Sequence, residues 1–183
     1  MLILTGLPGS GKTFVSNYFA QKGIPLVRMG DVTREELTKR KIADTPENED
    51  SMRRELREKY GSFVFAQRVV IKVFEYLKSS ELTFIEGMRS FDEAIFFKRE
   101  LPNVHIIFLK ADTHIRYARL KNRKNRRFSE KQAKDRDTYE GVTLGLNTIE
   151  KESDFVITNN ESNKELQKKL NSIFNTIQQW TQQ

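Results

Sequence analysis

The stretch Gly6-Leu7-Pro8-Gly9-Ser10-Gly11-Lys12-Thr13 is the most informative part of this chain. It follows the apolar run Leu2-Ile3-Leu4 and has the pattern G-x-x-x-x-G-K-[ST] of a phosphate-binding P-loop. Its small residues let the backbone wrap a phosphate chain, so that successive N–H groups form a nest for an anion. A helix that begins at about Lys12 adds the positive end of its dipole. The pattern therefore predicts a nucleoside triphosphate site between a buried strand and a helix.

Two side chains of this loop have predicted roles of their own. Lys12 reaches the β and γ phosphates, and the Thr13 hydroxyl ligates Mg²⁺. Residues 6–11 contribute mainly backbone to the nucleotide site. A Gly-rich turn without a ligand is the structural alternative, but average glycine usage makes a chance match rare, in roughly one chain in a hundred or fewer. The predicted cofactors are therefore ATP and Mg²⁺.

Composition limits the remaining possibilities. The chain has 183 residues, 37% hydrophobic and 31% charged, so we expect one soluble domain over residues 1–183. No apolar run approaches the length of a transmembrane helix, and residues 1–5 do not have the features of a signal peptide. The absence of cysteine excludes disulfides and thiolate metal sites and is compatible with a cytoplasmic protein. The two histidines, His105 and His114, are too few for a histidine-rich metal site.

The net charge of +7 suggests nucleic-acid binding until the charge is localised. Residues 116–136 contain ten Lys/Arg and two Asp/Glu, so the rest of the chain carries a net charge of about −1. A concentrated basic segment suits the phosphates of a small ligand as well as those of a polymer. Because a P-loop is present, we favour a small ligand over nucleic acid. No pattern in the sequence indicates an oligomeric state.

Strand and helix patterns alternate along the chain. The expected strands are residues 2–4, 25–28, 82–85, 104–109 and 155–157. The expected helices are residues 12–22, 31–41, 47–60, 62–78, about 91–100, 112–122, 129–140 and about 162 onward. This order predicts a three-layer α/β P-loop fold, with a five-stranded, mostly parallel sheet and helices on both faces. We also expect a helical acceptor-binding insert at about residues 31–78 and a short basic lid at about residues 119–136.

Ligands of such sheets bind beyond the carboxyl ends of the strands, so the residues that follow each strand are candidate site residues. These candidates are Gly30, Asp31 and Arg34 after the second strand, Glu86 and Arg89 after the third, Arg116, Arg119 and Arg123 after the fourth, and Thr158-Asn159-Asn160 after the fifth. The three arginines after the fourth strand are spaced to share one face of a helix. The loops are expected to converge around the P-loop.

The order of these motifs resembles that of the adenylate kinase and nucleoside monophosphate kinase family. The shared order is the P-loop, then G-D-x-x-R, an acidic-G-x-R turn and R-L-x-x-R. Length and spacing also resemble the small archaeal adenylate-kinase-related proteins of unassigned substrate, over nearly the whole chain. There the similar motifs are G-D-V-x-R-E-E, T-P-E-N, E/D-G-x-R-S and a late R-D-x-x-E.

The resemblance implies a P-loop kinase that moves the γ-phosphoryl group of Mg-ATP to a small phosphorylated acceptor, a nucleoside monophosphate. It places Gly30 and Asp31 at the acceptor site. In the same way, it places Arg34 and Arg89 on the acceptor phosphate.

The resemblance also assigns residues to the transferred group and to the nucleotide. Arg119 and Arg123 would bracket the transferred phosphoryl group. Arg136 would join them from the lid, and Asn159 would border the adenine.

Two features depart from the family pattern and leave alternatives open. The third strand ends in Glu86, where these kinases usually carry Asp to hold a Mg²⁺-bound water, and residues 124–128 leave a lid too short for the zinc- or strand-containing type. Glu86 also suits a kinase that phosphorylates a hydroxyl, such as that of dephospho-coenzyme A or a nucleoside, with Asp31 or Glu86 as the base. An ATP-binding regulator or RNA-associated protein is the third alternative.

Several candidates also have purely structural interpretations. Asp31 is a typical helix N-cap, and Arg34 could be a solvated surface charge. Glu86 and Arg89 could pair with each other, and the basic helix could be a solvated face.

Overall fold

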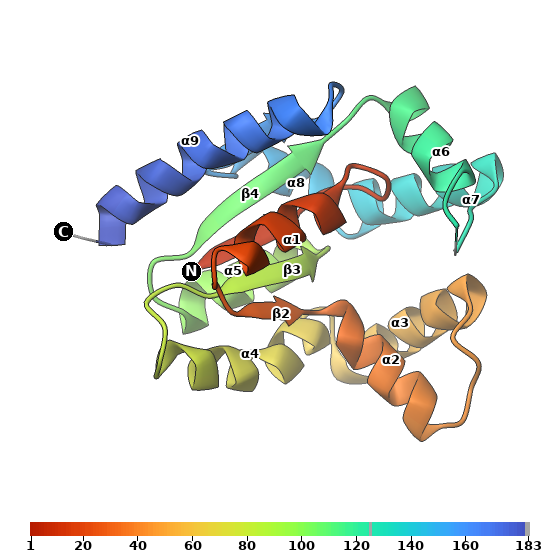
Figure 1. Ribbon diagram of the computed structural model, residues 1–183. Helices are drawn as coiled ribbons and strands as arrows, with labels where there is room; N and C mark the ends of the chain where they lie inside the picture. Colours follow the sequence, from red (N-terminus) through yellow and green to blue (C-terminus); the bar gives the residue numbers. More distant parts are fainter. Residues whose placement is uncertain (125, 182–183) are drawn as a thin grey trace.

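The computed structural model describes residues 1–124 and 126–181. Five strands form one sheet in the order β2-β3-β1-β4-β5, and every neighbouring pair is parallel. The strands are β1 (Leu2–Thr5), β2 (Leu26–Arg28), β3 (Phe84–Met88), β4 (His105–Lys110) and β5 (Phe155–Thr158). Helices lie on both faces of this sheet (Figure 1), which confirms the α/β fold predicted from the strand–helix alternation.

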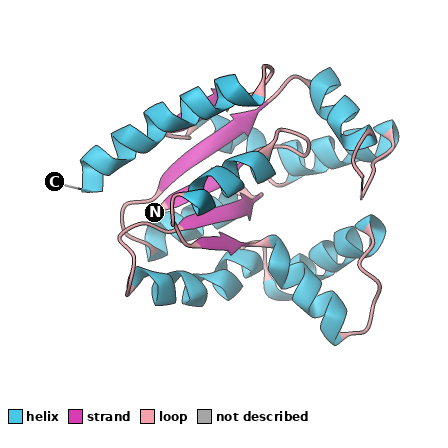
Figure 2. Cartoon of the chain, in the orientation of Figure 1, coloured by secondary structure: helices cyan, strands magenta, loops and turns pink. Residues whose placement is uncertain are grey.

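Helices make up most of the described chain (Figure 2). They are α1 (Lys12–Gln21), α2 (Gly30–Lys39), α3 (Pro46–Tyr60), α4 (Val64–Leu77), α5 (Phe91–Glu100), α6 (Thr113–Lys121), α7 (Glu130–Thr138), the π-helix η1 (Tyr139–Thr143), α8 (Leu146–Lys151) and α9 (Asn163–Thr181). None of the helices in the described part of the chain is long and apolar enough to cross a membrane.

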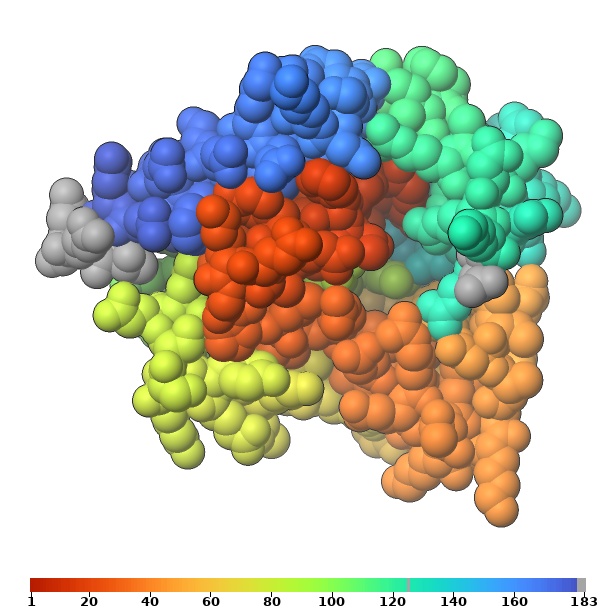
Figure 3. All heavy atoms as spheres, in the orientation of Figure 1, coloured from red at the N-terminus to blue at the C-terminus, as the bar shows by residue number. Residues whose placement is uncertain are grey.

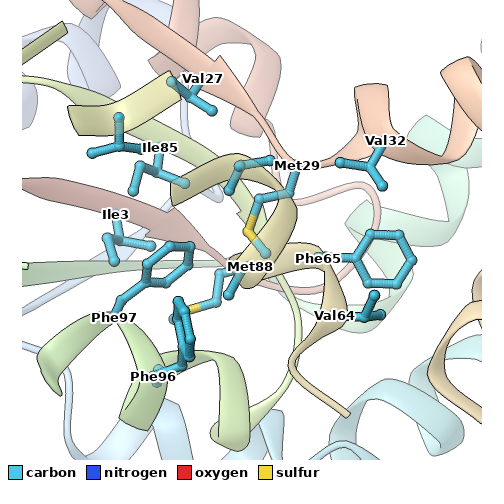
Figure 4. Close-up of a cluster of buried hydrophobic side chains, with 14 of the residues drawn as sticks. Ile3, Val27, Met29, Val32, Val64, Phe65, Ile85, Met88, Phe96 and Phe97 are labelled. Atoms are coloured by element: carbon cyan, nitrogen blue, oxygen red, sulfur yellow. The ribbon is translucent and has the colours of Figure 1, made fainter. Parts of the chain in front are cut away.

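The sheet separates two hydrophobic cores, because successive side chains of a strand point to opposite faces. Ile3 and Ile85 belong to the core under α2–α5 and α8, part of which Figure 4 shows. Leu4 and Phe84 belong to the core under α1 and α9. There, the Phe19 ring of α1 stacks on Phe84 with their centroids 4.6 Å apart. All strands but the short outer ones are covered on both faces, so their apolar runs are continuous.

Two of the helices near the site, α5 and α3, begin with side-chain caps. At α5, Ser90 and Glu93 form a capping box. At α3, the Thr45 hydroxyl accepts a hydrogen bond from the Asn48 N–H at 3.2 Å, and Pro46 takes the first helical position. These caps fix where each helix starts relative to the carboxyl edge of the sheet.

The prediction that Asp31 is a helix N-cap is wrong. Helix α2 begins at Gly30, with Met29 as its N-cap residue, so Asp31 already lies in the first turn. Its carboxylate accepts a hydrogen bond from the Arg34 guanidinium at 2.7 Å. The side chain therefore pairs within the helix instead of capping it.

Strand β3 runs further than expected, to Met88, so Glu86 and Gly87 belong to the strand and not to the turn after it. The polar Glu86 suggested an end to the apolar run, but parallel pairing continues past it. Glu86 pairs with Leu4 of β1 and Arg28 of β2 in the sheet register. Pairing across the sheet, which no single-strand pattern reports, decides where β3 ends.

The sequence patterns did not predict η1 and α8. Gly141 and Gly145 suggest a loop between α7 and β5, and α8 has only six residues, too few for a periodic pattern to be recognised. The Gly145 backbone has φ +71°, which glycine adopts without strain, and it precedes α8 as the N-cap residue. This segment matters because η1 contributes a residue to the candidate site.

Candidate functional site

The P-loop joins β1 to α1 and is held by residues far away in the sequence. Asn159, at the end of β5, donates a hydrogen bond from Nδ2 to the Ser10 carbonyl at 2.7 Å. A Cβ on Gly11 would lie 2.4 Å from that Nδ2, and the Gly11 backbone has φ +104°. Only glycine fits this position. No side chain caps α1, whose first N–H groups therefore remain available to an anion.

A cavity of about 410 Å³ lies beside the P-loop, at the carboxyl edge of the sheet. The surface is hollowed between the orange α2–α3 segment and the teal α6–α7 segment, as Figure 3 shows. The cavity is lined by Gly6, Pro8, Gly9, Gly11, Lys12, Thr13, Arg34, Pro46, Glu49, Glu86, Arg89, Arg119, Arg123, Arg126, Phe128, Arg136 and Glu140. Seven of these residues are cationic and three are acidic, so the walls carry a net positive charge that suits a polyphosphate.

Lys12 lies in this cavity without a carboxylate partner. Its ammonium donates hydrogen bonds to the Gly6 carbonyl and, at 3.1 Å, to the Leu7 carbonyl. Burial lowers the pKa of Lys12 to about 8, and Glu140, the largest opposing influence, only partly offsets it. A bound phosphate would supply the missing anion.

The buried carboxylate of Glu140, in η1, organises two of the arginines. It accepts hydrogen bonds from Arg89 Nη1 at 3.0 Å and from Arg136 Nε at 2.9 Å. Burial raises the pKa of Glu140, but Arg89, Arg136 and Lys12 outweigh it and hold the pKa at about 2. Glu140 therefore fixes two guanidinium groups beside the P-loop. π-Helices are rare and frequently occur at functional sites.

The α6–α7 connection and the α2–α3 connection meet across the mouth of the cavity. Arg126 Nη2 lies 2.6 Å from an Asp44 carboxylate oxygen and 2.9 Å from Glu49 Oε1. Arg34 also faces Glu49, at 3.8 Å, besides its bond to Asp31. Asp44 and Glu49 thus lie between two arginines, Arg126 of the α6–α7 connection and Arg34 of α2, and are within ion-pair distance of both.

The three arginines after β4, expected to share one face of a helix, do not all line the cavity. Arg123 lines the cavity, where burial lowers its pKa and the nearby Arg136 and Arg126 lower it further. Arg119 lines the cavity too, but it also donates to the Asn159 carbonyl at 3.0 Å, which puts it between the P-loop and β5. Arg116 does not line the cavity.

Arg116 instead holds three segments together. Its guanidinium forms a two-pronged ion pair with Asp137 at 2.9 and 2.6 Å and donates to the Pro8 carbonyl at 3.1 Å. The residue is 3% exposed. It therefore links α6, α7 and the P-loop.

Most of the predicted site residues come together in this cavity. Those that line it are Gly6, Pro8, Gly9, Gly11, Lys12, Thr13, Arg34, Glu86, Arg89, Arg119, Arg123 and Arg136. Those that do not are Leu7, Ser10, Gly30, Asp31 and Asn159; Leu7, Ser10 and Asn159 still belong to the P-loop hydrogen bonding. Gly30 borders a separate, smaller void.

The alternative pairing of Glu86 with Arg89 is not formed. Glu86 lies 3.5 Å from Arg28 Nε, and Arg89 binds Glu140. Glu140 and Glu49 were not among the predicted site residues. Glu140 is the last residue of the R-D-x-x-E motif, and Glu49 directly follows the T-P-E-N motif.

Thr13 and Glu86 fit a magnesium site. Both line the cavity, and Thr13 Oγ1 forms no hydrogen bond with the described residues. The described part of the chain has no cluster of three or more His, Asp or Glu residues that could hold a metal. Mg²⁺ at nucleotide sites needs none, because it takes one or two protein oxygens together with phosphate oxygens and water.

Comparisons with known proteins bear on the family and the fold. A family profile described as an AAA domain matches residues 2–140. UPF0200 proteins from Pyrococcus horikoshii and Thermococcus onnurineus are 35% and 33% identical to this chain, and each alignment covers 97% of both chains. Among solved structures, TT1252 from Thermus thermophilus has a TM-score of 0.68 at 19% identity, covering 96% of each chain. Shikimate kinase from Bacteroides thetaiotaomicron has a TM-score of 0.60 at 16% identity, covering 97% of each.

The structural likeness extends over almost the whole chain, so the chain shares the fold of these structures, a five-stranded parallel sheet with helices on both faces. The sequence likeness to the two relatives is also full-length. The chain therefore belongs to the UPF0200 family and carries an AAA domain.

Proposed function

We propose that this protein is a P-loop kinase that transfers the γ-phosphoryl group of Mg-ATP to a small phosphorylated acceptor, a nucleoside monophosphate. One observation carries the proposal: Lys12 shares a single cavity with Arg89, Arg123 and Arg136, which come from three other segments. Phosphoryl transfer needs little covalent chemistry from a protein, because its transition state spreads negative charge over the phosphoryl oxygens. Cations that converge on a P-loop supply what that step requires.

In this proposal, different cations neutralise the phosphates of the donor nucleotide and the oxygens of the transferred group. The bond between the γ-phosphorus and the β–γ bridging oxygen breaks while an oxygen of the acceptor phosphate bonds to the same phosphorus, which yields ADP and a nucleoside diphosphate. Lys12 follows the transferred group, and Arg123 and Arg136 neutralise its oxygens. Thr13 and Glu86 would hold Mg²⁺, which supplies charge neutralisation at the β and γ phosphates when bound.

Arg34 and Arg89 hold the acceptor phosphate in this proposal. Each is oriented by a carboxylate, Asp31 for Arg34 and Glu140 for Arg89, so the guanidinium planes are fixed before the acceptor arrives. A phosphate acceptor is already an anion at neutral pH and needs no strong general base.

A coupled assay for ADP release, run with AMP, CMP, GMP, UMP, dephospho-coenzyme A and a nucleoside, tests the proposal. We expect turnover with a nucleoside monophosphate and none in the Lys12→Ala variant. Arg34→Ala and Arg89→Ala should raise the acceptor KM or lower kcat, with ATP affinity within a few-fold of wild type. Wild-type turnover in Lys12→Ala, or loss of ATP binding in both arginine variants, would overturn the assignment.

A hydroxyl acceptor is the second candidate, and the position of Glu86 favours it. The carboxylate lines the cavity and forms no hydrogen bond with the described residues, with Arg28 Nε 3.5 Å away, so its oxygens could accept a proton from a hydroxyl. Asp31 does not line the cavity and is bonded to Arg34, so the geometry favours Glu86 as the base. Transfer to a hydroxyl that is lost in Glu86→Gln, with no transfer to any monophosphate, would establish this candidate instead.

A further inference from the structure

A second, much smaller void lies next to the phosphate cavity, between α2, α3, α4 and the end of β3. It measures about 10 Å³, room for one water-sized group. Arg89 lines both spaces, so the two adjoin. A Cβ on Gly30, which also borders the void, would have no atom of the described residues within 4 Å, so there is open space beside this residue.

Buried hydrogen-bonding groups without partners gather at this void. Within the described residues, six buried side-chain atoms have no hydrogen-bond partner. Three of them, Thr33 Oγ1, Arg53 Nη2 and Arg57 Nε, belong to residues that line it. Most buried polar groups in proteins are satisfied, so three orphans around one void indicate that something else satisfies them.

These groups lack hydrogen-bond acceptors, not negative charge. Arg53 already has a carboxylate partner in Glu49, at 3.2 Å, and Arg57 has one in Glu93, at 2.9 Å. Among their buried atoms, Nη2 of Arg53, which lies 3.6 Å from Asp50 Oδ1, and Nε of Arg57 remain without a hydrogen bond to the described residues. A neutral oxygen or ring nitrogen satisfies such a group without adding an unbalanced buried charge.

We infer that the void receives the oxo edge of the acceptor's base, so that the acceptor is a nucleoside monophosphate of guanine or uracil and not of adenine. This inference rests on the proposed function. A carbonyl oxygen accepts from the guanidinium donors, as guanine O6 and N7 do. The 6-amino group of adenine is itself a hydrogen-bond donor, so it could not pair with the N–H groups of the guanidiniums. A site built for one pattern rejects the other because its buried polar groups stay unpaired.

A competing position for the base makes the opposite prediction. A cavity of about 470 Å³ lies between α3 and α7 and adjoins the phosphate cavity at Pro46, Phe128 and Arg136. Its wall includes Asp135, whose carboxylate forms no ion pair or hydrogen bond with the described residues. A base bound there would be selected for amino groups, and AMP would be preferred.

The test compares kcat/KM for GMP, UMP and AMP in the wild-type protein, with affinity for each measured separately by calorimetry. We expect GMP or UMP to exceed AMP by about a hundredfold. If AMP equals or exceeds both, this inference is wrong while the proposed function stands, and the void holds only water. If no nucleoside monophosphate is phosphorylated, both are wrong.

Matched variants test whether Thr33, which lines the void, contributes to the selectivity for GMP or UMP over AMP. Thr33→Val removes the orphan hydroxyl at constant shape and should lower the GMP-to-AMP or UMP-to-AMP ratio about tenfold. Thr33→Ser should restore it. Thr83→Val is the control, because Thr83 is equally buried and its Oγ1 is also an orphan, but it precedes β3 at the opposite edge of the sheet. An equal change in both valine variants, or none in Thr33→Val, would contradict the assignment; thermal unfolding confirms that each variant is folded.

Discussion

At the scale of single residues, the charge of Lys12 is central to the site. Its ammonium donates to backbone carbonyl groups in the free protein and would interact with phosphate oxygens when ATP binds. The ammonium is buried among carbonyl groups, and its pKa is lowered from 10.5 to about 8. A folded-state pKa below the unfolded one means that the charged form opposes folding at neutral pH. This opposition disappears as the pH rises from about 8 toward 10.5. A phosphate that restores the charge balance reverses the shift, so binding and protonation of Lys12 are linked.

We therefore predict that ATP affinity falls as the pH rises above about 8, approaching tenfold per pH unit. Binding at pH 8.5 should also take up protons, because the bound phosphates raise the pKa of Lys12. Calorimetry in two buffers of different ionisation enthalpy measures both effects. Lys12→Arg is the control, since arginine stays charged over this range. Wild-type affinity that is constant from pH 7 to 9.5 would contradict the prediction.

Glu140 is the second residue on which the site depends. Its pKa, held at about 2 by Arg89 and Arg136, is below its ordinary value of 4.5. The carboxylate therefore stabilises the fold above about pH 4.5, and this contribution is lost as the pH falls toward 2. Its removal leaves two half-buried guanidinium groups, those of Arg89 and Arg136, without their shared ion-pair partner.

Glu140→Gln should lower the free energy of unfolding by about 3 kcal/mol at pH 7, the cost of breaking a buried ion pair. Because wild type loses the same stabilisation in acid, the difference between the proteins should shrink at pH 3. Urea denaturation at the two pH values measures this. The control is Glu150→Gln, whose pair with Lys110 is largely exposed and should change stability by less than about 1 kcal/mol. Equal stability of wild type and Glu140→Gln at pH 7 would show that the pair is not stabilising.

At the scale of elements, the α6–α7 connection contributes residues to the wall of the cavity, and its action as a lid stays a prediction. Arg123 and Arg127 both follow α6 and are both exposed, but only Arg123 lines the cavity. An arginine guanidinium matches phosphate oxygens with a planar fork that lysine lacks. The two arginines thus offer a comparison within one connection.

Arg123→Lys should lower kcat by about two orders of magnitude, the scale seen when one preorganised donor is removed from a transition state. ATP affinity of the free protein should change much less. Arg127→Lys should leave kcat near wild type. The ADP-release assay with the preferred acceptor measures kcat, and calorimetry measures affinity. Unchanged turnover in Arg123→Lys, together with weaker polynucleotide binding, would instead favour a nucleic-acid role for the basic segment.

At the scale of the whole molecule, two distant parts of the chain close over one cavity. Arg126 bonds to Asp44 and Glu49, and Gln132 donates to Glu47 at 3.1 Å. These contacts join the α6–α7 segment to the α2–α3 segment, and two of them connect residues 82 and 85 positions apart in the sequence. Both segments are therefore expected to open together.

Arg126→Ala should speed amide hydrogen exchange in residues 41–48 and 122–132 at the same time, because the mutation removes the shared contact. Exchange in β1 and β4 should not change. Arg127→Ala, a neighbouring exposed arginine without those partners, is the control. Faster exchange in only one of the two segments would show that they move independently.

The sequence by itself determined the P-loop, the strand–helix alternation and the strand-end positions of most candidate residues. These are local features. The spacing of Gly6 and Lys12 is set by the backbone that wraps a phosphate, and apolar runs such as 104–109 report burial on both faces of a sheet. Capping residues such as Ser90 act within one turn, so they too can be read without a structure.

Only the tertiary structure decided which charges meet. Nothing in the spacing of Arg116, Arg119 and Arg123 shows that the first binds Asp137 in α7 while the last lines the cavity. Likewise, Glu140 reaches Arg89 across 51 positions in the sequence. Charged side chains are interchangeable in local patterns, and their partners are chosen by burial, which makes an unpaired charge costly wherever the fold places it.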